Sequence, residues 1–189
     1  MSTPQFDRKL SYSDYLLWDD EERIEIIDGI PYNMSPTPST KHQQVSMNLS
    51  FQLMNFFKER NCQVFAAPFD VRLFSKGKKN DEVFNVVQPD ISVICDTNKL
   101  DDQGCIGSPD FIIEILSPSS VKMDKIVKRN LYEKANVKEY WIVDILNKLI
   151  EVYYLDSKNQ YGKPLFFTIE DDIKSYFFGG LEINLKEIF

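Results

Sequence analysis

Two carboxylates stand alone in strongly apolar stretches of this 189-residue sequence. Glu114 is flanked by Ile113 and Ile115 in the run FIIEIL, and Asp90 follows Pro89 in VVQPDISVIC. Burying an unpaired carboxylate costs several kcal/mol, so each acid needs a cationic partner or exposure at a sheet edge. The types and surroundings of these residues therefore indicate a site for a cation.

A divalent metal ion is one such cation. Mg²⁺ commonly binds one or two protein carboxylates, and water and substrate phosphate complete its octahedron. If the two apolar runs are neighbouring strands, Asp90 and Glu114 can reach one ion, so we predict that they bind Mg²⁺ or Mn²⁺. The alternatives are a buried salt bridge for Glu114 and a turn cap for Asp90.

A third candidate group lies on a helix that we predict from Ser120 to about Ala135. Asp124, Lys128 and Tyr132 are spaced four residues apart and therefore share a helix face. If that face covers the strand containing Glu114, the Lys128 ammonium could stabilise an attacking hydroxide or the charge growing on a phosphate. The alternative is a surface ion pair between Asp124 and Lys128.

The sequence contains one histidine, which excludes a metal centre with several histidines. His42 stands in STKHQQ, at the first turn of another predicted helix. We expect its role there to be a hydrogen bond at the helix start, with a contact to substrate phosphate as the alternative.

Periodicity predicts the elements that must hold these groups. From Ser39 to Arg60 apolar residues recur every three or four positions, which predicts the longest helix. RIEII and IPYNM flank Asp28-Gly29, a pair typical of tight hairpin turns. We predict strands at FDVRLF, VVQPDISVIC, FIIEIL, EYWIVDI and LIEVYYL, and further strands with a helical turn in the tail. The pattern indicates an α/β chain, which we interpret as one domain over residues 1–189.

Composition limits the possible partners. The net charge of −7 argues against a protein that coats nucleic acid, because phosphate binding depends on cationic side chains. The basic segment from Lys122 to Lys138 is either a local contact face or a solvated helix surface. No apolar run approaches the roughly 20 residues needed to cross a bilayer, and the N-terminus lacks the pattern of a secretory signal. We therefore expect a cytoplasmic protein without a membrane partner.

Cysteine usage suggests no covalent cross-link. Cys62, Cys95 and Cys105 form no CxxC pair, and the first two lie in apolar stretches where a thiol packs as a small hydrophobic group. We expect neither a disulfide nor structural zinc.

Several of these segments together resemble the Uma family of restriction-endonuclease-like proteins, in the PD-(D/E)XK nuclease superfamily. They are RIEIIDGIPYNMSPTPSTKHQQ, FDVRL, QPDISVICD, PDFIIEILSPSS and VKEYWIVD, with Asp124, Lys128 and Tyr132 before the last. The resemblance covers roughly Ser11 to Tyr154. It implies an α+β fold in which helices flank a mixed β-sheet behind an N-terminal β-hairpin, with Asp90 and Glu114 as metal ligands and a homodimer as the assembly.

The chain departs from the usual superfamily motif at one position. The catalytic lysine normally stands two residues after the glutamate, where this chain has Leu116. The resemblance suggests that Lys128 has taken over this role. It also matches Glu25 to an acid that can reach the metal through water, with a place on the polar face of a strand as the alternative. His42, Gln43 and Lys125 are candidate substrate contacts.

Three functions follow from these residues. The first is an Mg²⁺- or Mn²⁺-dependent endonuclease that hydrolyses phosphodiester bonds in DNA. The second is a nuclease-derived module that binds nucleic acid without cutting it, which Leu116 and the negative net charge favour. The third is another hydrolase that uses paired carboxylates, such as a glycosidase, which the separation of the carboxylates would distinguish.

Overall fold

The computed structural model describes residues 8–18, 23–34 and 37–189. Its helical elements are α1 (Tyr12–Tyr15), α2 (Thr40–Phe57), η1 (Asn80–Glu82), η2 (Thr97–Lys99), η3 (Met123–Lys128), α3 (Arg129–Lys134) and η4 (Leu185–Glu187). Its strands are β1 (Ile24–Ile27), β2 (Ile30–Asn33), β3 (Gln63–Ala66), β4 (Val71–Arg72), β5 (Val86–Val87), β6 (Ile91–Ile94), β7 (Leu100–Asp101), β8 (Gly104–Ile106), β9 (Phe111–Ile115), β10 (Glu139–Asp144), β11 (Leu149–Tyr154), β12 (Leu165–Thr168), β13 (Asp172–Lys174) and β14 (Glu182–Asn184).

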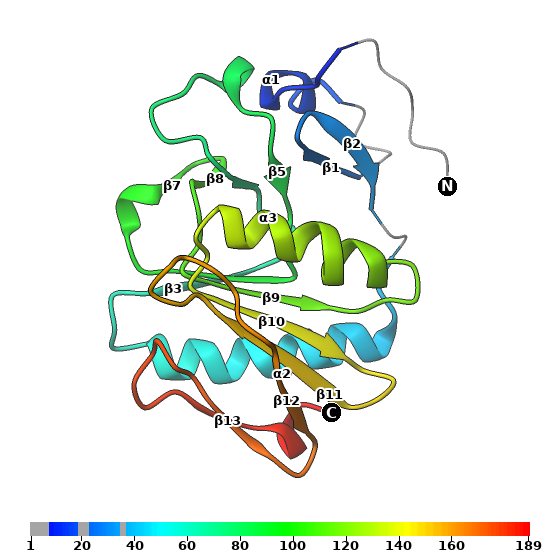
Figure 1. Cartoon of the computed structure of the whole chain (residues 1–189), viewed down its shortest axis with the longest axis vertical. Coiled ribbons are helices and arrows are strands. Elements are labelled where there is room, and N and C mark those ends of the chain that lie inside the picture. The colour runs from blue at the N-terminus through cyan, green and yellow to red at the C-terminus, as the bar shows by residue number, and fades with distance from the viewer. Residues whose placement is uncertain (1–7, 19–22, 35–36) are drawn as a thin grey trace.

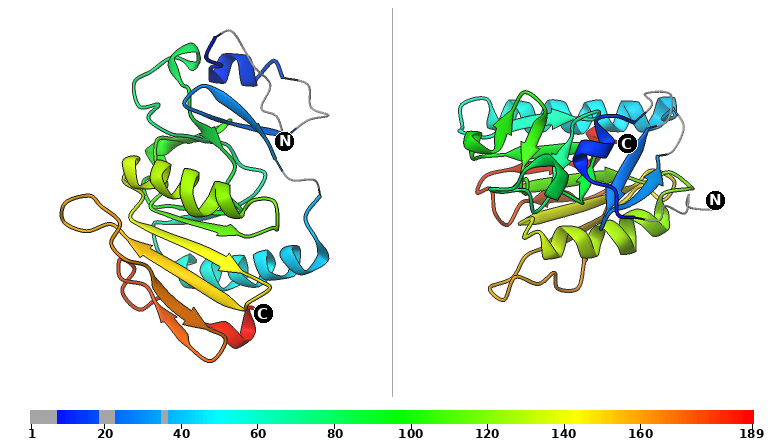
Figure 2. Two further views of the ribbon diagram at one scale, coloured as in Figure 1. Left: turned by 45° about the vertical axis from the view of Figure 1, so that its right-hand side comes forward. Right: turned by 90° about the horizontal axis from the view of Figure 1, so that it is seen from above.

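The strands form two larger sheets. One has the order β2-β1-β5-β4-β8-β7, the other has the order β12-β11-β10-β9-β6-β3, and β13 pairs with β14. In the second sheet β9 runs parallel to β10 and antiparallel to β6, so the sheet is mixed. Helices α2 and α3 cover its opposite faces (Figures 1 and 2). The α+β fold with a mixed sheet between helices is therefore confirmed.

Local sequence signals explain two of the elements. Asp28 and Gly29 both have positive φ, at 52° and 82°, which is the conformation that joins β1 to β2 in a tight hairpin. Ser39 caps α2 by accepting a hydrogen bond from the His42 backbone N–H. From there a buried stripe packs on the sheet, consisting of Val45, Leu49, Leu53 and Phe57. The N-terminal hairpin and the long helix are confirmed.

The run VVQPDISVIC is two strands rather than the one that we predicted. β5 pairs with β1 and β4 in the first sheet, whereas β6 pairs with β3 and β9 in the second. The chain crosses between the sheets at Pro89 and Asp90, where Pro89 has no N–H to donate to a ladder. Asp90 therefore lies at the junction of the sheets, immediately before β6.

The expectation that the chain has no disulfide is wrong: Cys62 is bonded to Cys95, and Cys105 is a buried free thiol. β3 and β6 pair antiparallel with Gln63 opposite Ile94, so the next pair outward is Cys62 and Cys95. Their proximity depends on the register of two strands that lie far apart in the sequence.

None of the described helices is both long and apolar enough to cross a bilayer. Residues 1–7, which bear on the expected absence of a secretory signal, lie outside the described part of the chain.

Candidate active site

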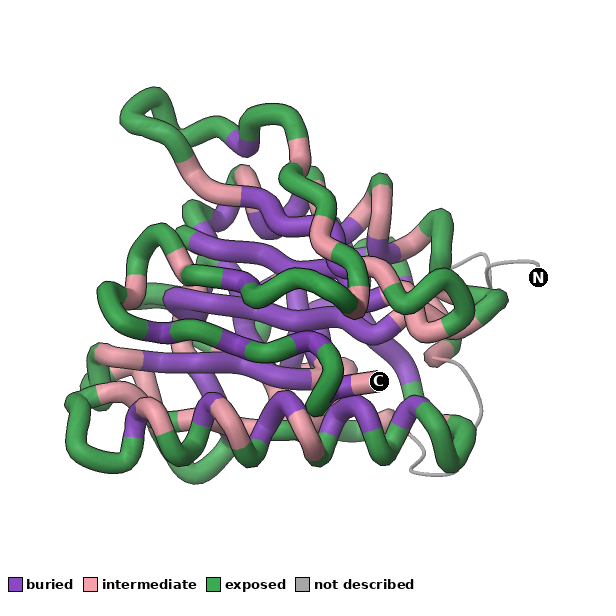
Figure 3. The backbone as a smooth tube through the Cα atoms, turned by 90° about the horizontal axis from the view of Figure 1, so that it is seen from below, coloured by how far each residue is buried: buried purple, intermediate pink, exposed green. Residues whose placement is uncertain are grey.

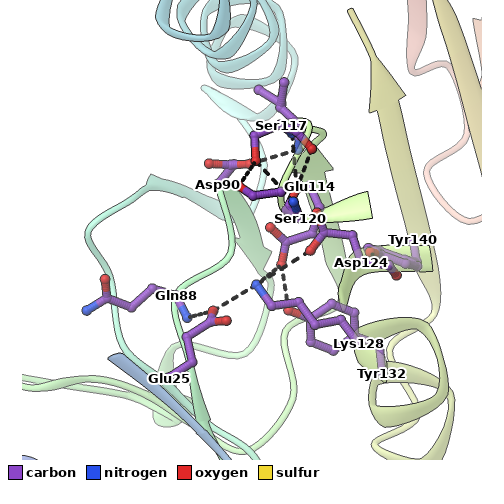
Figure 4. Close-up of polar contacts among 12 residues, drawn as sticks. Glu25, Gln88, Asp90, Glu114, Ser117, Ser120, Asp124, Lys128, Tyr132 and Tyr140 are labelled. Atoms are coloured by element: carbon purple, nitrogen blue, oxygen red, sulfur yellow. Dashed lines mark hydrogen bonds and ion pairs between the residues drawn. The ribbon is translucent and has the colours of Figure 1, made fainter. Parts of the chain in front are cut away.

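Three buried carboxylates surround the ammonium group of Lys128 (Figure 4). Its Nζ lies 2.8 Å from Glu25 Oε1, 2.9 Å from Glu114 Oε1 and 3.9 Å from Asp124 Oδ1. All four side chains are at least 95% buried. The predicted alternative of a surface ion pair between Asp124 and Lys128 is therefore wrong.

The first sheet supplies Glu25. This residue lies in β1, which pairs with β5, and Glu25 Oε1 accepts a hydrogen bond of 2.8 Å from the backbone N–H of Gln88. The side chain of Gln88 is held in turn, because its Nε2 donates to Tyr15 Oη and to Asp70 Oδ1, each at 2.9 Å. Glu25 is thus a buried site residue and not part of a solvated strand face.

The second sheet supplies Glu114, the next-to-last residue of β9. Lys128 and Tyr132 both donate to Glu114 Oε1, at 2.9 and 2.7 Å. Position 116, where the superfamily lysine would stand, is occupied by a leucine that packs against the apolar cluster on the α3 face. The ammonium comes instead from the helix that follows β9, as the resemblance suggested, and its catalytic role stays a prediction.

Asp90 is held against the end of β9. Its Oδ2 accepts a hydrogen bond of 2.7 Å from the Ile115 backbone N–H, and His42 Nε2 lies 3.4 Å from the same oxygen. His42 Nε2 also lies 3.2 Å from the Ile115 carbonyl oxygen. The expected hydrogen bond at the helix start exists through the His42 backbone N–H, but the imidazole itself belongs to the candidate site.

The cluster contains three carboxyl groups and one amine. Burial raises the pKa of Glu114 well above its ordinary value, and although Lys128 lowers it, the neighbouring carboxylates raise it further. Burial likewise raises the pKa of Asp124 to about 6. The pKa of Lys128 is lowered by burial but raised more by Glu114, Glu25 and Asp124, so the ammonium stays protonated. One lysine therefore faces several acids, and a further cation would be electrostatically favourable.

The expected ligand set of Asp90, Glu114 and Glu25 is not assembled as a ready-made metal site. Among the described residues, no group of three or more His, Cys, Asp or Glu side chains is placed to hold an ion together. The Lys128 ammonium bridges Glu25 and Glu114 where a cation would otherwise lie between them. The donor chemistry still fits a hard ion, since Mg²⁺ needs as few as one or two carboxylates.

Other predicted contact residues lie outside the cluster of acids. Gln43 is exposed on α2, and Lys125 forms an ion pair with Glu151. In the same basic segment, Arg129 pairs with Glu133 and Lys138 with Asp110. Because much of its charge is neutralised within the chain, the structure favours a solvated helix surface over a contact face. The substrate roles of Gln43 and Lys125 stay predictions.

Sequence reasoning missed two groups of the site. Tyr132 was noted for its spacing and for the family resemblance but was given no role, yet its hydroxyl donates to Glu114; its position four residues after Lys128 was the available signal. Gln88 had no signal of its own, because its contact with Glu25 is made by the backbone and depends on how β1 and β5 pair.

Comparisons with known proteins identify the family and support the fold. The Uma2 family model, described as "Putative restriction endonuclease", matches residues 12–186. An uncharacterized protein of Synechocystis sp. is 28% identical over 165 residues, which cover 86% of this chain and 81% of that protein. A crystal structure described as "a putative nuclease belonging to DUF820", from Anabaena variabilis, has a TM-score of 0.74 at 19% identity and covers 95% of this chain and 97% of its own. That likeness shows a shared fold.

Proposed function

The chain belongs to the Uma2 family of restriction-endonuclease-like proteins, and from this membership we propose that it is a divalent-metal-dependent endonuclease acting on DNA. The observation that carries the proposal is the buried excess of carboxylates around Lys128. Such an excess is costly in a purely structural core, whereas a divalent metal ion that binds there would offset it.

Asp90 and Glu114 are the residues that would hold Mg²⁺ or Mn²⁺, with Glu25 reaching the ion through water. When bound, the ion would polarise a phosphate oxygen and lower the pKa of a water molecule. The Ile115 N–H orients the Asp90 carboxylate, and the Tyr132 hydroxyl orients that of Glu114. These contacts restrict both acids before any ligand arrives, which reduces the ordering needed on binding.

Lys128 supplies the positive charge that the reaction needs beside the acids. Its ammonium is buried and adjoins Glu114, so its field is less screened than that of a surface lysine. In this proposal it stabilises the negative charge that develops on the phosphate during attack. A lysine at position 116 is not required for this role, because the stabilisation of the phosphate depends on where the ammonium group lies and not on which element carries it.

The test is nicking of supercoiled plasmid by the purified protein in Mn²⁺. Asp90→Asn, Glu114→Gln and Lys128→Ala should each reduce nicking by at least about a hundredfold, the usual effect of losing one transition-state contact. Lys134→Ala, at an exposed position of the same helix, is the matched control and should nick like the parent protein. Full activity in Asp90→Asn would contradict the assignment of Asp90 as a metal ligand.

A binding module that does not cut is the second candidate. It is favoured by Leu116 and by the way Lys128 already neutralises Glu25 and Glu114 without a metal. Calorimetry that shows Mn²⁺ binding, together with DNA binding but no cleavage of DNA or RNA, would support the module over the endonuclease. The carboxylate hydrolase of another class has no support from the family match.

A further inference from the structure

The outer face of α2 carries an apolar stripe that no described part of the chain covers. Met47, Phe51 and Met54 are 65%, 66% and 57% exposed. Figure 3 shows α2 along its lower edge, with buried positions toward the sheet and exposed positions facing outward. Large apolar side chains exposed together, instead of singly, mark an interaction surface more often than chance placement does.

The stripe has the spacing of a helix-pairing seam. Its positions are Gln44, Met47, Phe51, Met54 and Lys58, alternately three and four residues apart. This is the a/d spacing with which two helices interdigitate. The inward stripe that begins at Val45 already satisfies the core, so the outer one is not needed for folding of the single chain.

The neighbouring side of α2 is already occupied, which limits what else could cover the stripe. Asn48 Nδ2 donates to the Ile188 carbonyl oxygen at 3.2 Å, and Gln52 Nε2 donates to Glu187 Oε2 at 3.1 Å. The chain's own C-terminal turn thus packs beside the stripe and leaves Met47, Phe51 and Met54 in solvent.

The absence of charged side chains from most of α2 favours a second copy of the chain over nucleic acid or a membrane. Residues 42–57 contain no Asp, Glu, Lys or Arg, although 27% of the chain is charged and its net charge is −7. A face without cations does not attract nucleic acid or an anionic lipid surface. Two acidic copies repel each other over most of their surfaces, but at an uncharged face they can approach without like charges meeting.

We propose that α2 is the homodimer interface and that it pairs antiparallel with α2 of a second copy, Phe51 packing among the methionines of the other helix. Antiparallel pairing about Phe51 sets Lys58 of each copy opposite Gln44 of the other α2, one helical turn from Lys41, whereas parallel pairing would place the two Lys58 ammonium groups directly together. Antiparallel helices also align their dipoles favourably.

The expected dimer is weak. An 18-residue helix is about 27 Å long, so one helix pair buries less than the roughly 800 Å² per partner of a standard interface. Association should therefore depend on concentration in the micromolar range.

Sedimentation across that concentration range tests the interface, and it does not depend on nuclease activity. The parent chain should shift from monomer to dimer, and Phe51→Glu should remain a monomer because it places two carboxylates at the seam. Leu146→Glu, at a position that is 83% exposed elsewhere, is the matched control and should still dimerise. A parent chain that stays monomeric, or a dimer that Phe51→Glu leaves intact, overturns the proposal.

Cross-linking tests the orientation. Gln44→Cys protein mixed with Lys58→Cys protein should give a mixed dimer with a short bis-maleimide, and neither protein alone should give much cross-linked product. Efficient cross-linking of each variant with itself, and not in the mixture, overturns the antiparallel arrangement. Unchanged circular dichroism of Phe51→Glu, with the milder Phe51→Gln as a second variant, separates lost pairing from lost folding.

Discussion

At the scale of single residues, the main feature of the candidate site is a buried lysine that forms ion pairs with several carboxylates. Lys128 touches Glu25 and Glu114 within 3 Å, and Asp124 is one helical turn away. Removing one member of such a group is costly because the remaining charges stay buried without compensation. The stability of the chain and its affinity for a cation should therefore be linked through this residue.

Lys128→Met makes that linkage measurable. The variant should lose about 3 to 5 kcal/mol of stability without metal, because Glu25 and Glu114 lose their counter-charge. Mn²⁺ should then raise its melting temperature more than it raises that of the parent chain, since a ligand that binds only the folded state stabilises it. Differential scanning calorimetry with and without Mn²⁺ checks this. An equal rise in both proteins would show that the metal lies elsewhere, and Lys134→Met serves as the control.

The buried carboxyl group of Glu139 should make the stability of the chain depend on pH. Its carboxylate is fully buried, accepts hydrogen bonds from Trp141 Nε1 and Ser175 Oγ, and has a pKa that burial raises from 4.5 to about 7. A folded-state pKa above the unfolded value means that the folded chain holds the proton more tightly. The resulting stability is fully present below pH 4.5 and is lost as the pH rises through 7.

Urea unfolding as a function of pH tests whether the stability falls as the pH rises. The free energy of unfolding should fall by up to about 3 kcal/mol across that range because of Glu139, at roughly 1.4 kcal/mol per pKa unit. Glu139→Gln should remove this part of the pH dependence, and Glu182→Gln, at an exposed position, should not. If stability instead rises over this pH range, and Glu139→Gln abolishes that rise, the raised pKa of Glu139 is contradicted.

At the scale of elements, the site depends on short strands that meet at sheet junctions. The β7–β8 hairpin packs on β4, where the Cys105 N–H donates to the Asp70 carbonyl oxygen at 2.8 Å. Gly104 lies at this contact with φ of +122°, and a Cβ there would stand 2.2 Å from that oxygen. Because the Asp70 carboxylate holds Gln88, which donates to Glu25, the hairpin supports the site from outside.

Gly104→Ala should therefore destabilise the chain by more than the roughly 1 kcal/mol that a strained backbone alone costs. Gly77→Ala is the matched control, because Gly77 has φ of +75° and no atom within 4 Å of its ideal Cβ. Thermal unfolding of the two variants side by side measures the difference. If both lose the same stability, the close approach to Asp70 is not the cause.

At the scale of the whole molecule, one disulfide joins two neighbouring strands of the second sheet that are far apart in the sequence. The Cys62–Cys95 disulfide connects the start of β3 to the end of β6, 33 residues apart, and β6 begins directly after Asp90. Closing a loop of this size restricts the unfolded chain and typically stabilises a protein by about 2 to 4 kcal/mol.

Thiol titration of the denatured chain checks the link. Without reductant one thiol, that of Cys105, should react, and after reduction all three should react. Reduction, or Cys62→Ser, should also lower the melting temperature. Three reactive thiols before reduction would contradict the disulfide.

The sequence by itself determined the local structure and the family. The Asp28-Gly29 hairpin, the capped start of α2 and the carboxylate in β9 each follow from backbone preferences or burial costs that act within a few neighbouring residues. The motifs that contain them were also sufficient for the family, which the match over residues 12–186 confirms.

Only the tertiary structure decided which of these groups meet. That Lys128 reaches Glu25 across more than a hundred residues, that His42 lies beside Asp90, and that the chain changes sheets at Pro89 all depend on the packing of distant elements. Strand register and helix placement result from the summed burial of many side chains, so no single local pattern encodes them.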